Sequence, residues 1–541
     1  MGTLWFGGSI YTMVSEGETV EAVYTSNGKV IETGRLSDLR SRYITEITHE
    51  YDLCGGMMIP GLVDSHMHLI GHGESLLRLD LTTTRSREEL LEAIQQRAES
   101  SLEGQWIIGE GWDENNWLKA DIPTSAELSA VSPNNPVMLK RTCRHAILVN
   151  EEALRLAGID NNTPSPQGGV IEKDMNGTVT GYLKDQAQEI VYGILPKVDD
   201  LYLENALQTG IKSAWKLGLT GAHTEDLSYY GDFKTTYATF EKVINQYNMP
   251  FRAHLLVHHT VIDEWKEAGH DKPKDNPFIQ FGAMKIFADG ALGGRTALLS
   301  HPYADDPSTN GVAIHSKDEL HALVQKARSF NLPIAVHTIG DLAFEQVLEA
   351  IEKYPTPDGT RDRFIHAQIL RKELVERCKD LSVIFDIQPR FVASDFPWVL
   401  ERVGTEHYDY LYAWKTLLRD GIALAGGSDA PIEPLSPLLG IHAAVTRTKP
   451  GDPTHQVFIP EECLSMYEAV SLFTKGSAYA ENSESTFGMI EKGMRADFTV
   501  LHKDLFKASH DEILDTKVVM TVIDEKPVFL NEETPIICNS L

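Results

Sequence analysis

Positive charge is scarce in this chain of 541 residues. Lysine and arginine together number 49, against 78 aspartates and glutamates, which gives a formal net charge of −29. Because nucleic-acid binding needs a basic surface, this balance argues against nucleic acid as a partner. It does not argue against a local metal site, where a bound ion dominates the electrostatic field.

Cysteines and long apolar runs are also scarce. The chain has 5 cysteines and no CxxC pair, which indicates free thiols in a reducing compartment rather than a disulfide framework. No run of about 18 apolar residues exists to span a membrane. The N-terminal stretch MGTLWFGGSIYTM has neither the charged nor the apolar region of a secretory signal. We therefore expect a cytoplasmic protein that does not span a membrane.

The two ends of the chain look alike and differ from the centre. Short alternating segments separated by turn signals fill roughly the first and the last 55 residues, and Asn27-Gly28 marks a hairpin. We expect residues 1–56 and 483–541 to form one small β-domain from both termini. The central residues 57–482 would form a separate domain, with an insertion at about 80–197 that is too long for an ordinary crossover.

The centre alternates strand-like and helix-like segments. The strand-like segments are 58–68, 219–226, 252–259, 281–290, 332–341, 362–370, 382–389 and 422–431. Between two of them, a capping box from Ser316 to Glu319 opens a helix with Leu320, Leu323, Val324 and Ala327 on one face. Alternation of this kind predicts an α/β fold, a (β/α)8 TIM-like barrel.

The first of these strands, in the stretch MIPGLVDSHMHL, carries Asp64, His66 and His68 on alternate positions. Residues i and i+2 of a strand point to the same side, so the two imidazoles would project together as half of a transition-metal site. A bare His-x-His pair is as easily explained by two ordinary hydrogen-bonded histidines. Its context has to decide between these interpretations.

Four of the later strands end in, or contain, a further metal-competent side chain. These are Lys285, His337, His366 and Asp429. Each has an ordinary explanation when taken alone: a hydrogen-bonded histidine, a lysine that reaches solvent, or an aspartate that caps a helix. Their joint placement at the C-terminal ends of strands, where barrel enzymes carry their catalytic groups, favours a metal-dependent active site.

Several motifs along the chain resemble those of the amidohydrolase superfamily, and within it the amidohydrolase-3 group. They are IPGLVDSHMHL, GWDENNW, RHAILVNEEAL, KIFADGALGGRTA, AVHTIGDLA, RFIHAQI, GGSDAPIEPLSPLLGIHAAVTR and KGMRADFTVL. The resemblance covers nearly the whole chain and implies a (β/α)8 barrel with a β-sandwich-like domain formed by both termini.

The resemblance also implies site residues. The implied metal ligands are His66, His68, Lys285, His337, His366 and Asp429, for one or two divalent ions, with zinc as the expected metal. In such proteins the lysine at this place is typically N6-carboxylated, so the resemblance implies that Lys285 carries a carbamate that bridges two ions. The expected substrate contacts are Trp112, Asp113, His145 and Asp289. Arg144 departs from the family pattern, which commonly has glycine before this histidine.

The expected function is hydrolysis of a non-peptide C–N bond in a small-molecule amide, cyclic amide or N-formyl compound. Metal-activated water would attack, and Asp429 would carry the proton.

A mononuclear deaminase, or an esterase or lactonase, on the same fold stays open as an alternative function. A homodimer stays open as the oligomeric state. A catalytically inactive binding or scaffold relative should have lost ligands, and all six are present. GWDENNW is equally compatible with core packing of the insertion.

Overall fold

The computed structural model describes residues 2–114, 117–119, 121–141, 146–196, 198–270, 276–404 and 410–533, and the backbone of 538–539. The chain divides into two compact units. One comprises Met1–His72 and Gly210–Leu541, and the other comprises Gly73–Thr209. Among the described residues, no helix combines the length and the apolar character needed to cross a bilayer.

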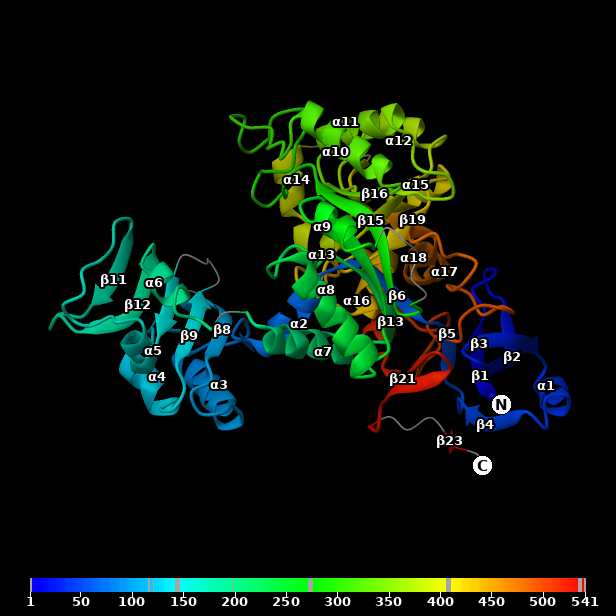
Figure 1. Cartoon of the computed structure of the whole chain (residues 1–541), viewed down its shortest axis with the longest axis horizontal. Helices are drawn as coiled ribbons and strands as arrows, with labels where there is room; N and C mark the ends of the chain where they lie inside the picture. Colours follow the sequence, from blue (N-terminus) through cyan, green and yellow to red (C-terminus); the bar gives the residue numbers. More distant parts are fainter. Residues whose placement is uncertain are drawn as a thin grey trace. The chain divides into compact units, whose positions relative to one another are not determined.

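The larger unit contains an eight-stranded sheet in the order β19-β18-β17-β16-β15-β14-β13-β6, and every ladder in it is parallel. The strands are β6 Leu62–Met67, β13 Leu219–Thr224, β14 Arg252–His258, β15 Ile279–Phe287, β16 Ile334–Thr338, β17 Asp362–His366, β18 Val383–Ile387 and β19 Leu424–Gly426. Seven of them lie within the segments that the sequence predicts as strands, and β15 begins two residues before its predicted segment 281–290. The expected (β/α)8 barrel is confirmed (Figure 1).

Helices follow most of these strands. They are α2 Leu69–Leu77, α7 Asp200–Lys216, α8 Phe233–Glu241 with the π-helix η2 Lys242–Gln246, α9 Ile262–Glu267, α10 Lys317–Ser329, α11 Asp341–Lys353, α12 Lys372–Cys378, α13 Phe391–Asp395, α14 Trp398–Val403, α15 Trp414–Arg419, α16 Pro437–Thr446, η4 Pro460–Glu462, α17 Met466–Ser471, η5 Leu472–Gly476 and α18 Ser477–Ala480.

Helix α10 shows how the local sequence sets these elements. The side chain of Ser316 accepts from the backbone N–H of Glu319, whose own side chain returns to Ser316, which is the predicted capping box. Of the four residues that the helical spacing predicts on one face, Leu320, Val324 and Ala327 are buried and Leu323 is half-buried. The cap starts the helix, and burial of this face holds it in place.

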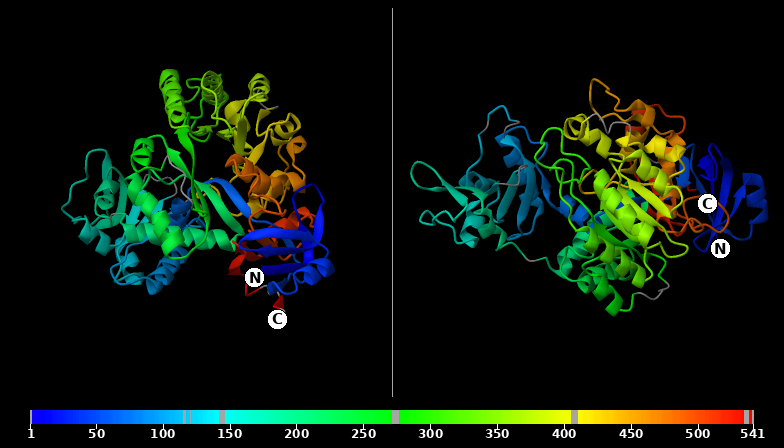
Figure 2. Two further views of the ribbon diagram at one scale, coloured as in Figure 1. Left: turned by 45° about the vertical axis from the view of Figure 1, so that its right-hand side comes forward. Right: turned by 90° about the horizontal axis from the view of Figure 1, so that it is seen from above.

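Strands from both ends of the chain share a second sheet in the same unit, ordered β22-β21-β20-β5-β1-β2-β3, with β4 paired to β1 and β23 paired to β4. Figure 2 shows the first and last segments of the chain side by side. The elements are β1 Gly2–Tyr11, β2 Thr19–Ser26, β3 Lys29–Gly34, α1 Leu36–Arg42, β4 Ile47–Asp52, β5 Met57–Pro60, β20 Phe498–Leu501, α19 His510–Leu514, β21 Val518–Ile523, β22 Lys526–Leu530 and β23 Cys538–Asn539.

The β2–β3 connection is the hairpin predicted from Asn27-Gly28. Ser26 pairs with Lys29 across it, and both turn residues have positive φ, 53° and 71°. Two-residue hairpins favour such a turn because its twist matches that of the strands. Asparagine and glycine tolerate positive φ better than other residues, so the local sequence is sufficient to set this turn.

The smaller unit holds a six-stranded sheet in the order β11-β12-β10-β9-β8-β7. Its elements are β7 Leu79–Asp80, α3 Arg87–Ser100, β8 Ile107–Trp112, α4 Ser125–Val131, β9 Val137–Arg141, β10 Ala146–Val149, α5 Glu151–Leu156, β11 Gly169–Lys173, β12 Val179–Asp185 and α6 Gln188–Tyr192. Trp112 and Trp117 lie in its hydrophobic core with Leu81, Leu90 and Leu139. The unit Gly73–Thr209 therefore has a hydrophobic core of its own.

Candidate metal centre

Polar side chains gather where the parallel barrel strands end. Those that the sequence predicts come from β6, β15, β16, β17 and the turn after β19: His66, His68, Lys285, His337, His366 and Asp429. The strand register brings His366 close to His337 without pairing the two, since His366 pairs with Thr338, the residue after His337. Strands that run in the same direction bring their C-terminal ends to one edge, so residues far apart in sequence meet there.

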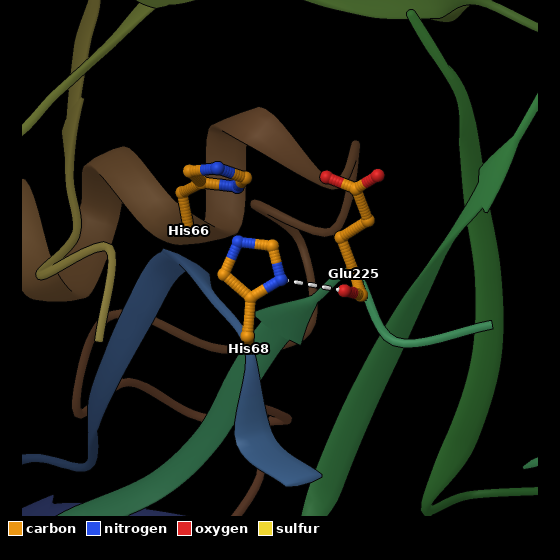
Figure 3. Close-up of side chains that lie close together, drawn as sticks. All are labelled: His66, His68 and Glu225. Carbon is orange, nitrogen blue, oxygen red and sulfur yellow. Dashed lines mark hydrogen bonds between the residues drawn. The ribbon is translucent and has the colours of Figure 1, made fainter. Parts of the chain in front are cut away.

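Two of these side chains and that of Glu225 form a group that fits a metal ion (Figure 3). One ligand atom each from His66, His68 and Glu225 lies within 4.8 Å of the others. The Nδ1 atom of His68 is 2.7 Å from the backbone oxygen of Glu225. Because a carbonyl oxygen only accepts, Nδ1 donates the hydrogen, so in the neutral form of His68 the lone pair would be on Nε2, where an ion can bind.

The Asp429 carboxylate faces His66 in β6 and His68 just after it. Its Oδ1 atom is 3.5 Å from His66 Nε2 and 3.6 Å from His68 Nε2. Burial alone would lower the pKa of His68, but Asp429, Glu225 and Asp226 raise it to about 9. Burial by itself would raise the pKa of Asp429, but the bond to His68 and the nearby cationic groups lower it. The pocket therefore favours an ionised carboxylate and positive charge beside it.

Asp64 brings the first and last barrel strands together. Its buried carboxylate accepts from the backbone N–H groups of His66 at 3.0 Å and of Ser428 at 3.0–3.1 Å. The backbone N–H of Asp429 donates to His66 O at 2.7 Å. A Cβ atom at Gly427 would lie 2.5 Å from His66 N, so this approach of the two strands requires glycine. Asp429 is thus aligned with the β6 histidines by the backbone.

Lys285 is fully buried, and its Nζ atom is 3.1 Å from Glu225 Oε2 and 3.2 Å from His66 Nε2. Burial first, and then the charge of Lys285, lower the pKa of His66 well below its usual value. His66 is therefore neutral, the form in which imidazole binds a metal. Lys285 therefore lies beside His66 and Glu225, two of the three residues in this group.

The other two predicted histidines form a second half-site. His366 Nε2 is 2.9 Å from His337 Nδ1, and burial lowers the pKa of both rings, that of His366 to about 4. The Nε2 atom of His337 is 3.2 Å from the backbone oxygen of Gly290, so it carries the hydrogen and Nδ1 carries a lone pair. Two neutral imidazoles that face each other through ring nitrogens fit a shared divalent ion.

The expected substrate contacts lie in different places. Asp289 is fully buried, and its carboxylate accepts from the backbone N–H groups of Leu298, Ile339 and Gly340 at 2.8–3.0 Å. It joins two loops beside His337, and burial raises its pKa to about 7. Through these hydrogen bonds Asp289 has a structural role, holding the two loops together, which the sequence did not predict.

The remaining expected contacts belong to the smaller unit. Trp112 is buried in its core, which agrees with the packing interpretation. Asp113 forms an ion pair with Arg141 at 2.8 Å. His145 lies outside the described residues. Their roles as substrate contacts stay predictions.

Glu225 is the site residue that sequence reasoning missed. It is fully buried and directly follows β13, in a segment that the sequence predicts as a barrel strand. Its signal was the same as that of the predicted ligands, a metal-competent side chain where a strand ends. The threonine, histidine and aspartate around it made that signal hard to single out.

Comparison with known proteins agrees with this geometry. The chain is 49% identical over 529 residues to a Bacillus subtilis (strain 168) protein named as the amidohydrolase YtcJ, covering 98% of this chain and 99% of that protein. It is 27% identical to N-substituted formamide deformylase of Arthrobacter pascens, with 95% and 96% covered. The crystal structure of an uncharacterized metal-dependent hydrolase from Pyrococcus horikoshii OT3 matches with a TM-score of 0.77 at 29% identity, covering 94% of this chain and 99% of that one. Since the model of the amidohydrolase family also matches residues 49–529, the chain belongs to that family.

Proposed function

We propose that this metal-dependent hydrolase cleaves a non-peptide C–N bond in an amide, a cyclic amide or an N-formyl compound. The observation that carries the proposal is the group of His66, His68 and Glu225 within 4.8 Å, with the Asp429 carboxylate 3.5 Å from His66. Similarity to N-substituted formamide deformylase supports the choice of a C–N bond.

The residues that would hold the ion are His66, His68 and Glu225, with Asp429 beside them and His337 and His366 as the second half-site. We expect zinc, because imidazole-rich sites favour it. A divalent ion held there supplies Lewis acidity, which makes water a usable nucleophile near neutral pH and polarises a substrate carbonyl.

Asp429 moves the proton in this proposal. Its ionised carboxylate takes a proton from the attacking water as the water oxygen bonds to the carbonyl carbon. It then gives that proton to the departing nitrogen as the C–N bond breaks, so the products are a carboxylic acid and an amine. Two hydrogen bonds keep this carboxylate beside His66 and His68. Asp429 N donates to His66 O, and His66 N donates to the side-chain oxygen Oδ1 of Asp64.

Lys285 allows two versions of the site. As an N6-carboxylated lysine it would bridge two ions. As an ammonium paired with Glu225, it would accompany a single ion, the arrangement of a mononuclear deaminase or an esterase or lactonase. Lys285 Nζ and Glu225 Oε2 are both fully buried and lie 3.1 Å apart, which is the ion pair that the second version would contain. Metal counting together with detection of the carbamate separates the two.

The experiment that tests the function is a hydrolysis screen with zinc-loaded and with chelator-treated protein. Formamides, N-acyl amines and cyclic amides would be compared with esters of the same acyl and side groups. We expect metal-dependent release of amine from at least one C–N compound, at a higher kcat/KM than for its matched ester. Cleavage of esters alone would contradict the proposal.

A further inference from the structure

The residue that follows strand β18 has no place among the predicted ligands, yet its side chain contacts one of them. Gln388 is 2% exposed. Its Nε2 atom is 3.1 Å from the backbone oxygen of Asp386. Its Oε1 atom is 2.6 Å from Nδ1 of His366. A single side-chain amide therefore joins the backbone of β18 to an imidazole at the end of β17.

These two contacts determine which way the amide points. A backbone carbonyl oxygen can only accept, so the group that faces Asp386 O is the amide N–H. The amide oxygen of Gln388 then faces His366 and can only accept as well. The Nδ1 atom of His366 must therefore carry the hydrogen. This assignment follows from the donor and acceptor groups alone and does not depend on observed hydrogen positions.

The opposite nitrogen of the ring consequently carries the lone pair. That atom, Nε2, is the one that lies 2.9 Å from Nδ1 of His337. The ring is also confined by Phe391, which stacks on it at 5.9 Å between centroids and 13° between planes. Packing thus limits the tilt of the ring, while the amide selects its tautomer.

We propose that Gln388 is a positioning residue, which holds His366 as the Nδ1–H tautomer and so presents its Nε2 lone pair to a divalent ion shared with His337. The inference rests on the proposed function for the identity of the bound group. Partners behind metal-binding histidines orient the ring and raise its basicity, and their loss typically costs about 10–100-fold in metal affinity.

The test compares three variants of the full-length protein. Gln388→Met keeps the length of the side chain and removes the acceptor. Gln388→Glu keeps an acceptor at the same position. Gln188→Met is the matched control, because Gln188 is also a buried glutamine whose amide bonds to a backbone oxygen, that of Asp185, and to a side chain, that of Tyr192.

Two readouts are needed. The first is the zinc affinity of each variant, measured by competition with a chromophoric chelator in the absence of substrate. We expect Gln388→Met to lose about 10–100-fold in affinity, Gln388→Glu to retain most of it, and Gln188→Met to match the wild type. The second is the ¹⁵N spectrum of His366 in metal-free, histidine-labelled protein. It should show the Nδ1–H tautomer in the wild type and a mixture of tautomers in Gln388→Met.

Wild-type zinc affinity together with an unchanged tautomer in Gln388→Met would overturn the inference. Its failure is distinguishable from failure of the proposed function. A protein that hydrolyses no C–N compound but loses zinc affinity in Gln388→Met would refute the function and keep the positioning role. A wild type that binds no zinc would refute the metal centre, and the tautomer of the metal-free ring would still decide the role of Gln388.

Discussion

In the mechanism that we propose, a single carboxylate moves the proton. Asp429 follows β19, and its carboxylate meets His66 and His68 at 3.5 and 3.6 Å. Its pKa lies below the usual value because the bond to His68 and nearby cationic groups outweigh the effect of burial, which acts in the opposite direction. An ionised carboxylate in contact with the ligands is suited to act as a general base.

Replacing this carboxylate by an amide separates proton transfer from ion binding. We expect Asp429→Asn to retain most of its metal and to lose about 10²–10⁴-fold in kcat, the usual contribution of a general base. Steady-state rates and elemental analysis of the same preparation check this. Asp452→Asn, at an exposed turn where Asp452 bonds Thr454, should keep the wild-type rate. A kcat near that of the wild type in Asp429→Asn would remove Asp429 from the role.

Lys285 can have one of two chemical forms, a carbamate or an ammonium, and a single substitution distinguishes them. If it is carboxylated, Lys285→Ala removes an anionic bridge. The variant should then bind one ion or none and lose activity, and propionate should restore part of it. Wild-type protein prepared with ¹³C-bicarbonate should also show a carbamate carbon signal. If Lys285 is instead an ammonium paired with Glu225, that signal is absent. Full metal content and near-normal turnover in Lys285→Ala would reject the bridge.

His442 lies outside the proposed site, in helix α16. It provides a test of how burial changes the pKa of a histidine. It is 3% exposed in α16, and burial lowers its pKa to about 4. Above the unfolded pKa of about 6.5 both states are neutral, and the contribution of His442 to stability is fully present. As the pH falls toward 4, the unfolded chain takes up a proton that the folded one does not, so this contribution is lost.

We therefore expect His442→Gln to be less sensitive to acid than the wild type. The free energy of unfolding, measured with urea at pH 7.5 and pH 4.5, should fall less in the variant between the two values. An equal fall in both proteins would show that His442 does not titrate differently on folding.

At the scale of elements, strand β6 and the turn after β19 act as one structure. Asp64 at the middle of β6 accepts from Ser428 N, and Asp429 N donates to His66 O. The last barrel strand therefore joins the first where the ligands lie. Any side chain placed between these strands must separate them.

Gly427→Ala tests this junction. Its Cβ would lie 2.5 Å from His66 N and 2.8 Å from Asp64 Oδ1, and overpacking of this kind typically costs about 1–3 kcal/mol. We expect a lower free energy of unfolding and weaker zinc binding together. Gly34→Ala is the control, because a Cβ there meets nothing within 4 Å. Wild-type zinc affinity in Gly427→Ala would mean that the ligands do not depend on this close approach.

On the scale of the whole molecule, an ion at the site would connect strands that are far apart in sequence. His66 lies in β6, and Glu225 directly follows β13. His337 lies in β16 and His366 in β17. A ligand that binds only the folded state stabilises it by about 2.7 kcal/mol at 100 times its Kd. The stability of the barrel should therefore depend on the metal.

Chelation should lower the melting temperature of the wild type, and added zinc should restore it. Differential scanning calorimetry before and after chelator treatment measures the shift. The double variant His66→Ala/His68→Ala should melt at the same temperature with and without chelator. An equal chelator effect on this variant would assign the stabilisation to an ion bound elsewhere.

The sequence by itself determined the barrel strands, the hairpin at Asn27-Gly28, the capping box of α10 and the positions of His66, His68, Lys285, His337, His366 and Asp429. These features are local, because strand and helix periodicity and turn preferences act over a few residues. The ends of parallel strands meet by topology, so a polar side chain at a strand end could be placed near the others without coordinates.

Only the tertiary structure decided which groups face one another. The contact of Glu225 with Lys285, the amide of Gln388 behind His366, and the three backbone bonds of Asp289 join residues that are 60, 22 and between 9 and 51 positions apart in the chain. No periodicity relates such residues. Their contacts depend on strand register and on the paths of the loops, which arise from the packing of the whole barrel.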